Sequence, residues 1–131
     1  MNPQHALLAL TAPHWPALAQ AWTRAHVLLA NLSARKLRMG DSHAALAYAR
    51  YSAAASQGRG FKAHLREYSA LAQLGEHSLA YGALHRAYTL RGRDVTPTDT
   101  ARLERARELA RASAAAHNAP WTFREEVGTW H

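Results

Sequence analysis

The stretch that decides the fold is residues 40–92, GDSHAALAYARYSAAASQGRGFKAHLREYSALAQLGEHSLAYGALHRAYTLRG. It contains no proline, and its segments are rich in alanine, leucine and tyrosine between four nearly evenly spaced glycines, Gly40, Gly58, Gly75 and Gly92. Glycine is common just past the end of a helix, because without a Cβ it takes a positive φ at little cost. The spacing therefore predicts short helices that alternate with turns.

The same stretch contains an internal repeat of thirty-five residues. Each unit has a glycine followed at offsets of five and twelve residues by small side chains, in the sets Gly40, Ala45, Ser52 and Gly75, Ala80, Ala87. Both glycines follow a hydrophobic residue and precede an acid. A repeat of this kind is typical of stacked helical hairpins, in which small side chains let the two helices of a hairpin pack closely.

The pattern resembles the tetratricopeptide repeat, a helical hairpin of about 34 residues with a glycine in its turn. The resemblance covers roughly residues 29–92. The first unit has Leu29 and Leu32 at the large positions early in its first helix, and the second unit has His64 and Glu67 there instead. The resemblance implies a stack or bundle of antiparallel hairpins that presents a groove to a partner protein.

Composition agrees with a helical chain. Alanine, leucine and arginine are strong helix formers, whereas the chain has only three valines and no isoleucine to favour strands. At 131 residues the length suits a single domain. We expect one all-α domain over residues 1–131 with about five helices, a loose lead-in at residues 1–13 and an aromatic tail at residues 118–131.

Spacing of apolar residues and capping signals place the helices. The first should begin near residues 14–17 with a buried stripe of Trp15, Leu18, Trp22, Ala25, Leu29, Leu32, Lys36 and Met39. The next three should bury Ala45, Ala49, Ser52 and Ala53; Phe61, Leu65, Tyr68 and Ala72; and Ala80, Ala83, Leu84, Ala87 and Tyr88. Thr96 should cap a fifth helix that ends near Ala116, with Leu103, Ala106, Ala110 and Ser113 inward.

The chain is strongly basic, with a formal net charge of +7 and a pI near 10.6. This charge favours an anionic partner, either an acidic protein surface or nucleic acid. Arginines and a lysine near turns and helix ends are candidates for contacts to phosphates, namely Arg59, Lys62, Arg66, Arg86, Arg91 and Arg93. No helix, however, carries arginines along one face as a groove-reading helix does.

Our leading interpretation is a non-enzymatic interaction module, an adaptor or chaperone-like protein that binds an acidic protein or peptide. The predicted groove is lined by the exposed side of the third helix, at Lys62, Arg66, Ser69 and Gln73. A basic protein that binds nucleic acid through phosphates is the alternative.

Few residues point to catalysis. Cysteine is absent, and no two of the nine histidines stand three or four residues apart, so we expect no metal, no cofactor and no enzyme activity. One spacing nevertheless resembles the Arg, four residues, His motif of the HEPN ribonucleases, at Arg38 and His43. That resemblance implies that Arg38 stabilises phosphate charge and that His43 transfers a proton.

The last residues carry Trp121, Phe123 and Trp130, which are costly to leave in water. They either fold back on the bundle or dock onto a partner or a second copy of the chain. The apolar run at residues 6–10 is too short to span a bilayer, so we expect no membrane partner. A cytoplasmic protein is the default expectation.

Overall fold

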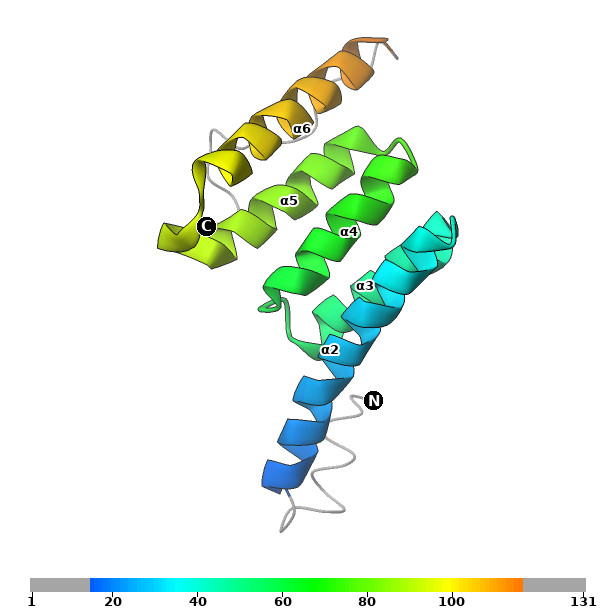
Figure 1. Cartoon of the computed structure of the whole chain (residues 1–131), viewed down its shortest axis with the longest axis vertical. Coiled ribbons are helices and arrows are strands. Elements are labelled where there is room, and N and C mark those ends of the chain that lie inside the picture. Colours follow the sequence, from blue (N-terminus) through cyan, green and yellow to red (C-terminus); the bar gives the residue numbers. More distant parts are fainter. Residues whose placement is uncertain (1–14, 117–131) are drawn as a thin grey trace.

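The computed structural model describes residues 15–116, except for the side chains of residues 15–19, 22 and 23 (Figure 1). Five α-helices, one 3₁₀ turn and no strand make up this part, which confirms the predicted all-α class. They are α2 Trp15–Arg38, α3 Ser42–Ala55, α4 Phe61–Gln73, α5 His77–Arg91, η2 Gly92–Asp94 and α6 Pro97–Ala116. The predicted lead-in and the aromatic tail lie outside the described residues.

The turns inside the two hairpins have the same backbone geometry. Gly40 joins α2 to α3 with a φ of +83°, and Gly75 joins α4 to α5 with a φ of +79°. In both turns the N–H of the acid after the glycine donates to the carbonyl five residues before it, at 2.9 Å. This hydrogen bond satisfies a carbonyl at the end of the helix and reverses the chain. The same turn is thus used twice, thirty-five residues apart.

Small residues lie where the helices of each hairpin meet, as predicted. Ala45 and Ala80 are 0% and 2% exposed, and Ser52 and Ala87 are both fully buried. The Oγ of Ser33 in α2 donates to the carbonyl of Ala45 in α3 at 2.6 Å. A side chain longer than alanine or serine at these positions would push the two backbones apart.

The helices pack largely in chain order (Figure 1). α3 lies against α2, α4 lies against both of them, α5 lies against α4, and α6 lies against α5. Within the described residues, the backbones of α6 and α4 do not approach each other. The last helix therefore extends the array through α5 alone.

The main core lies between the second hairpin and α6, and it follows the predicted stripes of α5 and α6. The predicted stripe of α4 is only half-buried, at Phe61, Leu65, Tyr68 and Ala72. The buried residues of α4 are Ala63, His64, Glu67, Ala70 and Leu71. The predicted inward residues of α5 are all buried, as are Ala106 and Ala110 of α6. Half-buried side chains from α4 and α6, among them Tyr68 and Leu103, pack against this cluster. The predicted cap is also present, because the N–H of Asp99 donates to Thr96 Oγ1 at 3.1 Å.

The buried face of α2 differs from the predicted stripe. Among its described side chains the buried ones are Ala30, Ser33 and Ala34, and the predicted stripe residues Trp15, Leu18 and Trp22 lie outside the described side chains. Leu29 and Leu32 are only half-buried, and Met39 is 67% exposed. Met39 lies one residue beyond the end of α2, in the turn, so it no longer follows the helical face. Neighbouring helices contact α2 where its side chains are small, and the leucine stripe therefore stays at the margin.

Candidate functional site

The four predicted groove residues, Lys62, Arg66, Ser69 and Gln73, form a row along α4, here called the α4 row. Lys62 and Gln73 are exposed, and Arg66 and Ser69 are half-exposed. Ser69 Oγ donates to a carbonyl one turn back in its own helix at 3.1 Å, and Gln73 Oε1 accepts from Ser42 Oγ at 2.7 Å. The Nε of Arg66 is buried without a hydrogen-bond partner. The Ser69 hydroxyl and the Gln73 amide oxygen are thus already engaged within the described part of the chain.

The predicted phosphate contacts are divided by the fold. Arg86 pairs with Glu67 at 3.4 Å, and Arg91 pairs with Asp99 at 2.9 Å while its guanidinium lies 4.8 Å from the centre of the Phe61 ring. These ion pairs offset the charge of two of the six candidates. The contact with Phe61 brings Arg91 to the end of the second hairpin where the α4 row begins. Of the other four candidates, Arg59, Lys62 and Arg93 are exposed and Arg66 is half-exposed.

A buried polar cluster of His64, Glu67 and Arg86 links α4 to α5, and it is called the His64 cluster below. His64 is 6% exposed and Glu67 is 8% exposed. His64 Nε2 lies 2.8 Å from the carbonyl oxygen of Gly58, and His64 Nδ1 lies 3.8 Å from Glu67 Oε1. Glu67 Oε2 accepts from the guanidinium of Arg86 at 3.4 Å. The cluster therefore ties the loop before α4 to both helices of the second hairpin.

This geometry favours the charged imidazolium form of His64. A carbonyl oxygen only accepts hydrogen bonds, so Nε2 must carry a proton toward Gly58. Nδ1 would then present a lone pair to the Glu67 carboxylate unless it is protonated too. Glu67 is the main cause that raises the pKa of His64 above its ordinary value, against the opposing effect of burial. At 3.8 Å this is a charge interaction, too long for a hydrogen bond.

Glu67 is held in its charged form by the same neighbours. Burial pushes the pKa of Glu67 upward, but His64 and Arg86, with a smaller contribution from Arg50, outweigh it and hold the pKa below its ordinary value. The carboxylate thus neutralises cations from its own helix and from α5. It adds no free negative charge to the surface of α4.

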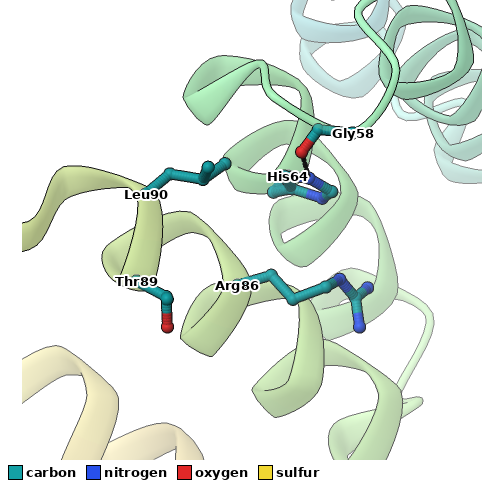
Figure 2. Close-up of a pocket in the computed structure, with 5 residues that line it drawn as sticks. All are labelled: Gly58, His64, Arg86, Thr89 and Leu90. Atoms are coloured by element: carbon teal, nitrogen blue, oxygen red, sulfur yellow. Dashed lines mark hydrogen bonds between the residues drawn. The ribbon is translucent and has the colours of Figure 1, made fainter. Parts of the chain in front are cut away.

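Beside the cluster is a small hollow of about 240 Å³, lined by Gly58, His64, Arg86, Thr89 and Leu90. Figure 2 shows that the side chain of Leu90 points toward His64 across the hollow, while the guanidinium of Arg86 extends away from Thr89 and Leu90. Pockets for small molecules usually measure roughly 300–1,000 Å³ and enclose most of the ligand. The hollow is below that range, so the His64 cluster is best understood as a structural link within the second hairpin and to the loop before it.

A second polar cluster, at the start of α6, has a structural role. The Asp99 carboxylate accepts from the Thr96 N–H at 3.1 Å, and the Asp99 N–H donates to Thr96 Oγ1. The Thr96 hydrogen bond is the main cause that holds the pKa of Asp99 below its usual value, and Arg91 adds to it. This reciprocal cap sets where α6 begins and fastens it to the end of α5.

Residues with catalytic or metal-binding chemistry are scattered. In residues 15–116 no group of three or more histidine, aspartate or glutamate side chains is placed to hold a metal ion. Arg38 is the exposed last residue of α2 and His43 is an exposed residue in the first turn of α3, with the Gly40 turn between them. The HEPN resemblance therefore stays a prediction about two exposed side chains.

The sequence interpretation missed the His64 cluster, although a signal for it was present. His64 and Glu67 stand at the positions that Leu29 and Leu32 occupy in the first unit. A histidine and an acid at two buried positions of a repeat need a partner. That partner, Arg86, is nineteen residues further along the chain and is identified only by the packing of α5 on α4.

Comparisons with known proteins found no match. No protein-family model matches the chain, and neither a curated protein nor a solved structure is significantly similar to it.

None of the helices that the structure describes has an apolar run long enough to cross a bilayer.

Proposed function

We propose that this protein is a small non-enzymatic interaction module, an adaptor or chaperone-like protein built from tetratricopeptide-like hairpins. Its α4 row binds an acidic segment of a partner protein. One observation carries the proposal: Lys62, Arg66, Ser69 and Gln73 stay exposed or half-exposed after the described helices have packed. Helix α6 covers α5 and leaves this side of α4 open.

The internal repeat supports a binding surface that extends beyond α4. At the same offset of thirty-five residues, α2 places Val27, Asn31, Ala34 and Arg38, of which Ala34 is buried and the other three are exposed. Because α2 lies against α4, the exposed positions of α2 are on a helix next to the one that carries the α4 row. An extended or helical peptide that lies across both helices would meet polar and cationic groups from each.

The electrostatics of α4 favour an acidic partner. Glu67 is the only acid in α4, and it is buried against His64 and Arg86. Lys62 and Arg66 therefore face the partner side without a compensating carboxylate in their own helix. Charge complementarity of this kind raises the association rate and selects against basic partners.

The proposal is tested by affinity capture from the native source with nuclease present. The baits are the unchanged chain, the double variant Lys62→Glu with Arg66→Glu, and a matched control, Arg105→Glu with Arg111→Glu, which alters two exposed arginines of α6. Circular dichroism first establishes that each variant is folded. We expect a protein partner that the unchanged chain and the control retain and that the α4 variant loses. Retention by the α4 variant contradicts the proposal.

Nucleic-acid binding is the second candidate, and one observation favours it. Arg59 and Lys62 are exposed at the start of α4, next in the chain to Gly60 and Phe61, and the guanidinium of Arg91 lies over the Phe61 ring. For two phosphate contacts, from Arg59 and Lys62, affinity for a labelled oligonucleotide should fall about 12-fold between about 50 and 200 mM salt. No oligonucleotide binding at the lower salt concentration excludes this candidate, whatever the capture experiment finds.

A further inference from the structure

A second surface lies on α2, at the end of the array opposite α6 (Figure 1). The thirty-five-residue offset relates five buried residues of α4 to five residues of α2. In α4 they are Ala63, His64, Glu67, Ala70 and Leu71, and in α2 they are Leu28, Leu29, Leu32, Arg35 and Lys36, here called the α2 face. Leu28 is 62% exposed, Arg35 is exposed, and the other three residues are half-buried.

The difference follows from position in the array. On α4 this side is covered by both neighbouring helices: Leu46 of α3 packs against the cluster that contains Leu71, and Arg86 of α5 pairs with Glu67. In residues 15–116 no hairpin precedes α2. Within residues 15–116, the α2 face therefore has the register of a helix-packing surface but stays exposed or half-buried.

The side chains of the α2 face indicate which kind of partner it can bind. Leu28, Leu29 and Leu32 make an apolar strip at helical spacing, and exposed cations lie along the same helix at Arg24 and Arg35. Helix α2 contains no acid at all. We propose that this face docks an amphipathic helix of a partner protein, with apolar residues against the leucines and acids against the arginines. This site is separate from the α4 row.

Charge argues for a partner over residues 1–14 and over a second copy of the chain. Residues 117–131 carry Glu125 and Glu126, so the thermal unfolding of Leu28→Asp described below distinguishes that segment from a partner. Residues 1–14 contain no acid, so they would leave the cations of α2 without complementary charge. A second copy of the chain carries the same net charge of +7, which opposes association at low ionic strength. An acidic amphipathic helix satisfies both the apolar strip and its cationic flanks.

The experiment uses the full chain and three synthetic helical peptides of matched length. One carries leucines at helical spacing flanked by glutamates, one has the same composition in scrambled order, and one has lysine in place of glutamate. Binding is measured by fluorescence anisotropy at physiological ionic strength. We expect the acidic amphipathic peptide to bind at least about tenfold more tightly than either of the others, a difference of about 1.4 kcal/mol.

Variants of the chain locate the binding site. Leu28→Asp, and separately Arg24→Glu with Arg35→Glu, should each weaken binding of the acidic peptide about tenfold. Leu109→Asp and Arg105→Glu, which alter two exposed residues of α6, should leave it unchanged. The inference is overturned if the acidic peptide does not bind, if the scrambled peptide binds equally well, or if Leu28→Asp binds as tightly as the unchanged chain.

Two further measurements distinguish the other occupants. If the face is open in the free protein, Leu28→Asp should leave the Tm within about 2 °C of the unchanged chain. A much larger fall would mean that a segment of the same chain covers Leu28, and it would overturn the inference. A concentration-dependent dimer in sedimentation that Leu28→Asp abolishes would assign the face to a second copy and overturn it equally. Neither result affects the capture test of the α4 row.

Discussion

The two hairpins share a turn and differ in what lies beside it. In the first hairpin, Leu29 and Leu32 occupy two positions early in the first helix and remain half-buried. In the second, the same positions hold His64 and Glu67, which are buried. The apolar pair is thus at the margin and the polar pair is inside. Burial here is set by a helix's place in the array, and the second hairpin tolerates buried polar groups because Arg86 completes them.

The largest effect should come from breaking the His64 cluster on one side only. Glu67→Leu removes the carboxylate that pairs with both His64 and Arg86 and leaves the buried His64 without its counter-charge. Because Arg86 is partly exposed and can be rehydrated, we expect a loss near the lower end of the usual range, about 3 kcal/mol of unfolding free energy. Urea unfolding followed by circular dichroism measures it. Glu104→Leu, at an exposed position of α6, is the control.

Making the second hairpin resemble the first should reverse that loss. The double variant His64→Leu with Glu67→Leu places leucines at both positions and leaves Arg86 free to turn to water. Replacing buried charged groups by apolar ones is often neutral or stabilising by about 1–4 kcal/mol. We expect the double variant to be at least as stable as the unchanged chain in the same urea titration. If the double variant loses as much unfolding free energy as Glu67→Leu alone, or more, the stability of this hairpin depends on its buried polar groups.

The shared turns should respond equally to the same substitution. A Cβ added at Gly40 or at Gly75 would meet no atom within 4 Å, so Gly→Ala costs only the strain of positive φ. That strain is about 1–2 kcal/mol at each site. Thermal unfolding of the two single variants should show similar falls in Tm. A clear difference between them would show that the two turns are not energetically equivalent.

The smallest effect is a pH dependence that belongs to the second hairpin. Because the pKa of His64 is raised on folding, its contribution is fully present below about pH 6.5 and is lost as the pH rises through the folded pKa. Because the pKa of Glu67 is lowered, its contribution is present above about pH 4.5 and is lost as the pH falls through its folded pKa.

Unfolding free energies measured across this range test the assignment. The unchanged chain should lose stability on going from about pH 6 to about pH 8.5, and the double leucine variant should lose less. Equal pH profiles for the two proteins would remove His64 and Glu67 as the source of the dependence.

Local features of the fold were predictable because they depend on near neighbours in the chain. The glycine turns, the Thr96 cap and the buried alanines of α5 follow from conformational preference and helical spacing. The α2 stripe was partly wrong, since the residues that become buried depend on the direction from which α3 and α4 approach. The α4 row was predicted as the exposed side of the third helix, and its role stays a proposal.

The sequence by itself determined that this protein is all-α, where its helices turn, and that small side chains lie where the helices of a hairpin meet. These properties depend on backbone preference and on spacing over a few residues. Only the tertiary structure decided that His64 and Glu67 are buried with Arg86, and that Leu28 is not buried. Burial depends on which helix lies beside which, and that is a relation between residues far apart in the chain.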